Sequence, residues 1–505
     1  MVEGDRRISR RDLLALAAGA VVGAGGAAAV ATAVTRPPDT ARAGSASPTP
    51  AAEEPSPPEL RRFVSTALTA PAVTVWTRSG ATPAPGYLFT TPRTEAFNAV
   101  VYDSAGEPVW IEPTGLAATD LRVQQFQGRP VLTYWSGRVY EGHGIGSATI
   151  LDDAYRPIAT VRTGGGVIAD LHEFALTARG TALLIGYPPA LADLTALDGP
   201  EEGHVLGGRV QEIDIATGAV LLDWEALDHV DLDESYQTLG KGADGSSAGA
   251  PFDPVHLNSV EDDGDALLVS ARHTSAVYRV DKATGEVLWR LGGRRSDYDV
   301  EEAAGFSWQH DARRRPDGRI SLFDNHGKSG SDGVSAGLIL DVDEDARTAT
   351  VAEALRHEER FGYAMGNLHV LADGSAVVGW GTEPVATEFD PDGEAVFELR
   401  DLGRGSYRVW KHEWVGRPAT PPDVGVRRSG DRLEVYASWN GATEVARWRV
   451  LAGADAGALT EAGSGPRTGF ETRIEVPDAR AVQVQALDAG GAVLGSSAVR
   501  PVPSA

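Results

Sequence analysis

The chain has 505 residues, of which 42% are hydrophobic, and it carries a formal net charge of −25. This length suits a globular protein of two or three domains. The acidic excess argues against nucleic acid and anionic membranes as partners, because phosphate binding needs clustered Lys and Arg. The chain contains no cysteine, which excludes disulfides, thiol catalysis and thiolate metal ligands.

The first 43 residues have the features of a twin-arginine export signal. The arginine pair 10–11 precedes an uncharged Ala/Gly-rich segment over 13–34, and Ala41 and Ala43 fit a cleavage site between small residues. We therefore predict residues 1–43 as a signal peptide and the mature protein as secreted. A segment of this length can also span a bilayer, so retention as a membrane anchor is the alternative.

Residues 44–72 are rich in Pro, Ala and Ser. Such a composition offers little apolar surface to bury, so we predict a disordered linker between the signal and the fold. Strand-like alternation of apolar and polar residues begins near Val73.

A motif recurs six times within residues 73–416. In each copy a hydrophobic pair leads into an Asp, a turn follows, and a second hydrophobic strand comes next. The repeated acidic residues are Asp103, Asp152, Asp214, Asp281, Asp341 and Asp390. A second hairpin element with a turn glycine precedes most copies, so two hairpins make a four-stranded unit. Strand repeats of this kind are typical of β-propellers, and we predict an all-β fold with a six-bladed β-propeller over 73–416.

Residues 421–505 form a second unit after a proline-rich connection. Short alternating strands separated by turn residues predict a β-sandwich. The strand order resembles that of a fibronectin type III-like domain, with Trp439 and Trp448 as core candidates. The unit has no histidine, and no chemistry is expected there.

All eleven histidines lie within residues 143–412. Counting eight residues back from the turn glycine of five successive repeats gives Asp120, His172, His256, His310 and Gly366. Equivalent positions of successive blades circle the propeller axis at one depth, so the three histidines of this series are expected to face one cavity. His369 lies on the same element of the next blade, three residues out of this register.

A histidine cluster allows two kinds of chemistry. Neutral imidazole is the commonest metal ligand, but the matched positions lack a close carboxylate pair or a His-x-His pair, so we predict no metal. Imidazole can instead attack an electrophile or transfer a proton near neutral pH. Neighbouring cations would then stabilise an anionic group in transfer.

Three motifs give the chain a resemblance to a known family. They are His-x-Asn-Ser at 256–259, Ser-x-Arg-His-x-Ser at 270–275 and Gln-His-Asp-Ala at 309–312. Together with the flanking repeats over roughly 73–415, they resemble the arylsulfotransferase family, in particular its actinobacterial and fungal branch. The resemblance implies a six-bladed propeller and an enzyme without a cofactor. Such an enzyme moves a sulfuryl group from an aryl sulfate to a phenol through a sulfated histidine, without a nucleotide donor.

The resemblance also implies roles for individual residues. His369 is the best candidate for the covalent nucleophile, and His256 would transfer the proton to and from the phenol. His310 and Arg272 would hold the sulfate oxygens, and His273 completes the Arg-His pair.

Other expected substrate contacts are less regular. The family carries an arginine after an Asp-Asn-Gly turn; here the sequence is Asp-Asn-His-Gly-Lys, so Lys328 or His326 would substitute. Asn258 would add a neutral donor, and His172 would line the same cavity.

Two alternatives remain open from the sequence. The first is a non-catalytic propeller that binds an anionic or aromatic ligand, with an adhesion-type C-terminal module. The second is a quinone-dependent dehydrogenase, suggested by the segment VYRVDKATGEVLW, although the repeats and tryptophan pattern of that class are missing. The nucleophilic histidine discriminates between the enzyme and the binding protein.

Overall fold

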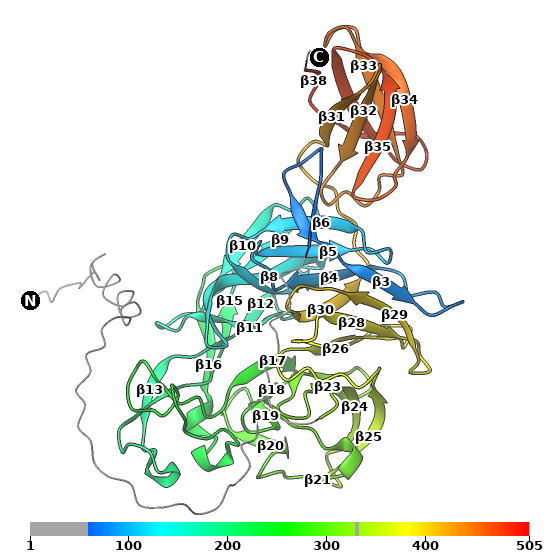
Figure 1. Ribbon diagram of the computed structural model, residues 1–505. Coiled ribbons are helices and arrows are strands. Elements are labelled where there is room, and N and C mark those ends of the chain that lie inside the picture. Colours follow the sequence, from blue (N-terminus) through cyan, green and yellow to red (C-terminus); the bar gives the residue numbers. More distant parts are fainter. Residues whose placement is uncertain (1–58, 329–332, 504–505) are drawn as a thin grey trace, which may run out of the picture. The chain divides into compact units, whose positions relative to one another are not determined.

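The computed structural model describes residues 59–328 and 333–503 (Figure 1). The predicted signal at 1–43 and most of the predicted linker at 44–72 lie outside these residues. The described chain forms β-strands and four short 3-10 helices, with no α-helix, so the all-β prediction is confirmed. Within the same residues, no helix is long and apolar enough to cross a membrane.

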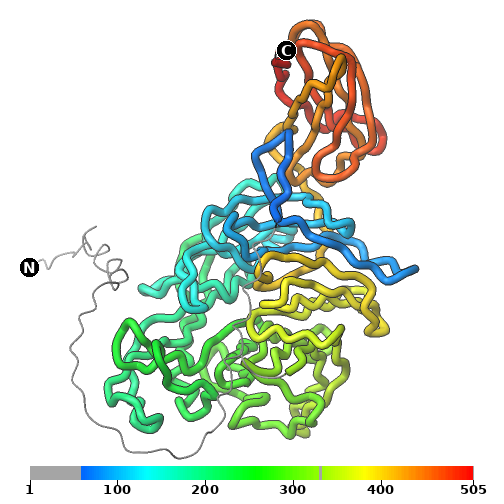
Figure 2. The backbone as a smooth tube through the Cα atoms, in the orientation of Figure 1, coloured from blue at the N-terminus to red at the C-terminus, as the bar shows by residue number. Residues whose placement is uncertain are grey.

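Sheets that are antiparallel except for the pair of β21 (Asp299–Val300) with β25 (Thr348–Leu355) succeed one another along the chain, and their path can be followed in Figure 2. The first sheet contains β30 (Ser406–His412), β4 (Tyr87–Pro92), β5 (Asn98–Tyr102) and β6 (Pro108–Pro113). The second contains β7 (Ala117–Phe126), β8 (Arg129–Tyr140), β9 (His143–Leu151), β10 (Pro157–Val161), β11 (Ala169–Leu176), β12 (Thr181–Gly186), β15 (Arg209–Asp214) and β16 (Val220–Glu225). Its two halves meet only where β11 pairs with β9.

Three further sheets complete this region. One contains β17 (Leu257–Asp263), β18 (Ala266–Ala271), β19 (Ala276–Asp281) and β20 (Val287–Gly292). The next contains β21 (Asp299–Val300), β22 (His310–Arg314), β23 (Ile320–Asp324), β24 (Ala336–Asp343) and β25 (Thr348–Leu355). The last contains β26 (Asn367–Val370), β27 (Ala376–Gly379), β28 (Val385–Phe389), β29 (Ala395–Arg400) and β3 (Thr74–Thr77).

Short elements connect these sheets. A hairpin of β13 (Pro189–Ala192) and β14 (Gly203–Leu206) lies in the long connection after β12. The 3-10 helices are η1 (Thr195–Leu197), η2 (Ala226–Asp228), η3 (Leu232–Glu234) and η4 (Glu302–Ala304). Within the predicted linker, β1 (Leu60–Arg62) pairs with β2 (Thr69–Pro71), and Phe63 and Leu68 pack on a hydrophobic cluster. These apolar side chains give the end of that segment a fold that its overall composition does not indicate.

Six strands bring the sheets together. β7, β11, β17, β22, β26 and β30 contact one another in this order, and β30 also contacts β7. In Figure 1 the sheets follow one another around a common centre. Residues at equivalent positions of these six central strands are therefore neighbours in space.

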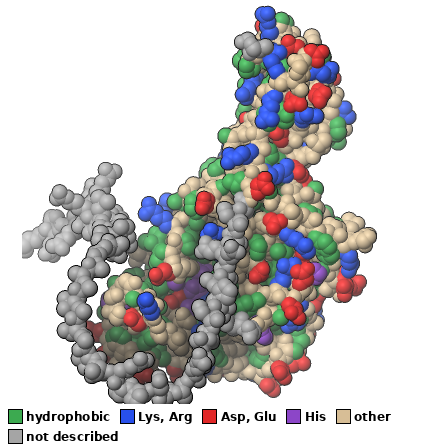
Figure 3. Space-filling model, in the orientation of Figure 1, with side chains coloured by type: hydrophobic (Ala, Val, Ile, Leu, Met, Phe, Trp, Pro, Cys, Tyr) green, Lys and Arg blue, Asp and Glu red, His purple; other side chains and the backbone are tan. Residues whose placement is uncertain are grey.

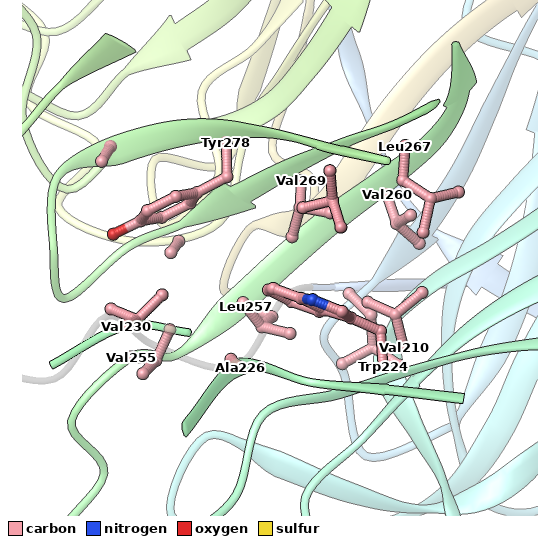
Figure 4. Close-up of a cluster of buried hydrophobic side chains, with 14 of the residues drawn as sticks. Val210, Trp224, Ala226, Val230, Val255, Leu257, Val260, Leu267, Val269 and Tyr278 are labelled. Carbon is pink, nitrogen blue, oxygen red and sulfur yellow. The ribbon is translucent and has the colours of Figure 1, made fainter. Parts of the chain in front are cut away.

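Apolar side chains fill the space between successive sheets. Figure 4 shows one such cluster, in which Val210 and Trp224 face Val260, Leu267 and Val269. A strand that is covered on both faces forms a continuous buried run, as β18 does, whereas an outer strand such as β25 alternates between buried and exposed residues. Each buried Val or Leu contributes about 1.5–3 kcal/mol to the stability.

A buried ion network joins the central strands. The Arg408 guanidinium on β30 is fully buried and lies 3.1–3.2 Å from carboxylate oxygens of Asp120, Glu173 and Asp311, on β7, β11 and β22. It also donates a 2.9 Å hydrogen bond to the Asn258 carbonyl on β17. A buried charge is tolerated only when it is paired, so this one side chain fixes the mutual position of five central strands.

Glu261 predicts a pH-dependent stability. Burial raises the pKa of this carboxyl to about 7, despite the nearby Arg313 and a hydrogen bond from the Arg314 amide. Between pH 4.5 and 7 the unfolded chain releases this proton while the folded chain keeps it, so the free energy of unfolding falls as pH rises. Glu261→Gln removes this loss. We expect the free energy of unfolding of Glu261→Gln, minus that of the wild type, to rise by about 3 kcal/mol between pH 4.5 and 8. Urea unfolding at a series of pH values measures both. The same pH dependence in the two proteins would contradict this.

The C-terminal residues form two sheets around one core. One sheet contains β31 (Asp423–Ser429), β32 (Arg432–Ser438) and β35 (Glu471–Pro477). The other contains β34 (Thr460–Pro466), β33 (Arg447–Gly453), β36 (Ala481–Leu487), β37 (Val493–Ser496) and β38 (Arg500–Pro501). Trp448 is buried in the shared core, and Trp439 is partly buried against it.

Candidate active site

Histidines gather where the central strands begin. His172 lies in β11, and His256 immediately precedes β17; their ring centroids are 4.8 Å apart. His310 begins β22 and joins the group through Tyr407 of β30, whose ring lies 6.5 Å from His310 and 5.6 Å from His172. Figure 3 shows histidine side chains gathered in a hollow on one face. The three positions matched in the sequence are thus brought together.

His256 has a strained backbone. Its φ of 53° lies in the left-handed region, which costs a residue other than glycine about 1 kcal/mol or more. Two hydrogen bonds hold it there: its amide donates to Asp253 Oδ1 at 3.0 Å, and its carbonyl accepts from the Arg272 amide at 2.8 Å. Strain of this kind is concentrated at functional sites.

Asp253 organises the histidines around it. Its Oδ2 accepts a 2.6 Å hydrogen bond from His256 Nδ1 and lies 3.0 Å from His143 Nε2, while its backbone carbonyl accepts from His273 Nδ1 at 2.7 Å. Burial alone would raise the pKa of Asp253, but His256 and His273 outweigh it and hold the pKa well below its usual range. The carboxylate therefore stays ionised.

The same environment acts on the histidines in opposite directions. Burial lowers the pKa of His256 well below its ordinary value, although Asp253 acts against this. Burial also opposes protonation of His143, but the hydrogen bond with Asp253 raises its pKa. His256 is thus neutral, whereas His143 is favoured in its charged form.

A second carboxylate holds His172. Asp170 Oδ1 contacts His172 Nδ1 and accepts a 3.0 Å hydrogen bond from the His172 amide. His172 and His256 therefore share one arrangement, in which a carboxylate engages Nδ1. Neither Nε2 makes a hydrogen bond to any residue in the described parts of the chain. A proton on Nδ1 leaves the Nε2 lone pair available for chemistry.

His310 uses both ring nitrogens structurally. Nδ1 donates to Asn325 Oδ1 at 2.7 Å, and Nε2 accepts from the Met365 amide at 3.2 Å. Burial, followed by the nearby Arg272, holds the pKa of His310 well below its ordinary value. Its ring is fixed as a neutral imidazole.

Arg272 supplies a fixed positive charge beside the cluster. One guanidinium nitrogen lies 3.1 Å from His273 Nε2, and the other donates to the Tyr363 carbonyl at 3.0 Å. Burial lowers the pKa of Arg272 to about 10 and that of His273 to about 4, so at neutral pH the arginine is charged and the histidine is not. Trp308 lies under both Arg272, at 4.7 Å, and Lys328, at 5.6 Å.

His369 is not brought to this group. Its ring contacts Trp410 and His412, with centroids 5.1 and 4.7 Å away, and its Nδ1 accepts from the Lys411 amide at 3.1 Å. Burial lowers its pKa to about 3. Three residues beyond the matched position correspond to about 10 Å along a strand. His369 therefore lies past the Arg408 network, towards the other end of the central strands.

Two further predicted contacts have other surroundings. Asn258 is buried, and its Nδ2 donates to the Gln309 carbonyl at 2.6 Å, which links two neighbouring strands. His326 has a half-exposed side chain and pairs with Asp324 at 3.2 Å. Asn258 reaches the cluster through its backbone carbonyl, which accepts a 3.3 Å hydrogen bond from the Tyr407 hydroxyl.

Sequence reasoning missed several members of the site. His143 begins β9, which is not a central strand, yet its ring lies 5.1 Å from His256 and 6.3 Å from His172. Tyr187 lies 4.5 Å from His143. No repeat register links these residues to the others. Donor atoms of His143, Asp253 and His256 lie within 4.8 Å of one another, a grouping able to hold a metal ion.

Solved structures similar to this chain are distant. A protein of unknown function from Dyadobacter fermentans is 12% identical, with a TM-score of 0.35, over 80% of this chain and all of the other. A putative 6-phosphogluconolactonase from Bacteroides uniformis is 12% identical, with a TM-score of 0.32, over 74% and 97%. The β-propeller domain of Myceliophthora thermophila Cps50 is also 12% identical, with a TM-score of 0.31, over 64% and 97%. Likenesses of this size carry no argument about function.

The comparison with family models is more specific. No curated protein matches the chain closely enough to count as a relative. The model described as arylsulfotransferase (ASST) matches residues 122–401, which is more than half of the chain and includes the histidine cluster. This chain belongs to the arylsulfotransferase family.

Proposed function

We propose that the protein transfers a sulfuryl group from an aryl sulfate to a phenol, with His256 as the covalent nucleophile and His172 as the general acid and base. Family membership supports the reaction class. The observation that carries the residue assignment is the pair of imidazoles 4.8 Å apart, each with Nδ1 engaged by its own carboxylate.

Each half-reaction balances on these two rings. In the first, His172 begins with protons on both ring nitrogens; His256 Nε2 attacks sulfur, the bond from sulfur to the aryl oxygen breaks, and His172 gives its Nε2 proton to the leaving phenolate and becomes neutral. In the second, His172 takes the proton of the acceptor phenol, whose oxygen attacks sulfur, and the bond to His256 breaks. The Nδ1 proton of His256 stays on the ring and donates to the ionised Asp253, so the carboxylate neutralises the positive charge that develops on the ring.

Positive charge near the rings offsets the charge of the sulfuryl oxygens. Arg272 is held in place by Tyr363 and His273, and His143 has a raised pKa. Sulfuryl transfer resembles phosphoryl transfer, in which positioning and electrostatic stabilisation supply most of the catalysis. Preorganised cations of this kind act without reorganising during the reaction.

These roles differ from those that the family resemblance implied. His369 was the expected nucleophile, but its ring packs against Trp410 and His412 rather than against His256. We therefore assign the attack to His256 and the proton transfer to His172. His310 positions the neighbouring backbone through Met365.

The test is to trap the covalent intermediate. We expect a chromogenic aryl sulfate, supplied without a phenol acceptor, to release a burst of one phenolate per chain. Mass spectrometry of the digested protein should then find the added sulfuryl group on the peptide that contains His256. The group on the His172 peptide would overturn the assignment. Absence of burst and adduct would reject the reaction, and tight binding without turnover would identify a binding protein instead.

We also propose the finer architecture and the export of the chain. Contact of β30 with β7 supports closure of the sheets into a six-bladed propeller. The orders β31–β32–β35 and β34–β33–β36–β37 support a fibronectin type III-like domain. The twin-arginine pattern at 10–11 supports export, followed by cleavage or by retention as an anchor.

A further inference from the structure

We propose that His143, Asp253 and His256 form a binding site for a divalent transition metal ion such as Zn²⁺, and that the bound ion blocks sulfuryl transfer. The blocking part rests on the proposed function, whereas the binding part does not. The donor atoms are two imidazole nitrogens and one carboxylate oxygen, all buried and within 4.8 Å of one another. Zn²⁺ takes this combination of ligands at about 2.0–2.2 Å.

The donors are already oriented around one point. Asp253 Oδ2 lies 2.6 Å from His256 Nδ1 and 3.0 Å from His143 Nε2. An ion at this point would need movements of only a few tenths of an ångström to about 1 Å from each donor. His273 Nδ1, 3.8 Å from the same oxygen, lies at the edge of the group.

A neighbouring hydrogen bond already holds the carboxylate of the proposed site in place. The other carboxylate oxygen of Asp253 is held by the His256 amide at 3.0 Å, which directs Oδ2 towards the histidines. Outer hydrogen bonds of this kind fix the orientation of ligands, and their loss typically weakens metal binding by about 10–100-fold.

Metal binding and catalysis need different forms of His256. Catalysis needs the proton on Nδ1 and the lone pair on Nε2. A metal ion on Nδ1 takes that lone pair, so the proton of the neutral ring moves to Nε2, and the Nε2 proton of His143 leaves to solvent. His256 then has no free lone pair for attack on sulfur. The ion and the sulfuryl group are therefore mutually exclusive on this ring.

The second grouping of possible ligands in the described chain offers a control. His357, Glu358 and Glu398 also lie within 4.8 Å of one another, but Arg360 and Arg400 already pair with Glu398. Guanidinium groups occupy the carboxylate where an ion would sit. We expect no metal there, so His357→Gln is a matched substitution of a histidine outside the proposed site.

The experiment titrates the full chain, freed of metal, with Zn²⁺ by calorimetry and with Co²⁺ by visible absorption. We expect one ion per chain, a Co²⁺ spectrum with nitrogen ligation, and at least about a tenfold loss of affinity in His143→Gln but not in His357→Gln. Absence of stoichiometric binding, or equal affinity in His143→Gln, would overturn the site.

Activity measurements then test whether the bound ion blocks sulfuryl transfer. Zn²⁺ should inhibit sulfuryl transfer by the wild type and by His357→Gln over the concentration range in which calorimetry shows the site filling, and a chelator should reverse the inhibition. The metal titrations contain no sulfuryl donor, so they test metal binding even if the protein does not transfer sulfuryl groups. Stoichiometric Zn²⁺ with undiminished transfer would overturn the blocking role.

Discussion

His256→Asn is expected to lose sulfuryl transfer by about 1,000-fold or more, as happens when a covalent nucleophile is removed. Asparagine keeps an N–H donor for Asp253 and tolerates the left-handed backbone, where φ is 53°. The change therefore removes the Nε2 atom with little effect on the fold. Steady-state turnover of an aryl sulfate with a phenol acceptor measures the loss, and circular dichroism checks the fold.

The matched control is His369→Asn. Its amide oxygen can replace Nδ1 as the acceptor for the Lys411 amide, so packing near Trp410 is largely kept. Because His369 lies past the Arg408 network, we expect its turnover to stay within about threefold of the wild type. Loss of turnover in His369→Asn together with normal turnover in His256→Asn would return the nucleophile to the position implied by the family resemblance.

Arg408→Met is expected to lower the free energy of unfolding by about 3–5 kcal/mol, the usual effect of removing one partner from a buried ion network. Methionine keeps much of the side-chain length, but it leaves Asp120, Glu173 and Asp311 with less positive charge. Chemical denaturation measures the change. The free energy of unfolding of Arg408→Lys should lie between those of the wild type and Arg408→Met, because a lysine keeps the charge but not the planar set of donors.

An exposed arginine with several carboxylate partners serves as the control. Arg295 pairs with Asp231 and Asp233, and its side chain is 44% exposed. Water and salt screen such pairs, so Arg295→Met should lower the free energy of unfolding far less than Arg408→Met does. Equal effects of the two substitutions would show that burial of the network does not determine its contribution.

The fold was predictable where the sequence repeats. Six recurrences of the hydrophobic–Asp–turn motif indicated successive strand units, and the strands of the all-β structure follow that order. Two strand pairings of this fold have no local signal in the sequence. β3 pairs with β29, and β4 pairs with β30, across most of the chain. Such pairings depend on how distant segments meet, which a repeat pattern does not encode.

The site was predictable only in part, for a related reason. Repeat register placed His172, His256 and His310 at the same level, because equivalent strand positions are neighbours. It gave no means to find His143, which lies on an outer strand, or Asp253, one of 71 acidic residues. His369 shows the converse, since a shift of three residues on the same kind of element separates it from the cluster.

The pairing of β4 with β30 has a consequence for how the chain matures. The Thr91 amide donates to Ser406 Oγ across 315 residues, so β4 has an uncovered edge until the ribosome has made almost the whole protein. An exposed strand edge invites aggregation during synthesis. A nascent chain stalled before β30 should therefore need a chaperone, and quality control would have to wait until β30 has paired with β4 before passing the molecule on.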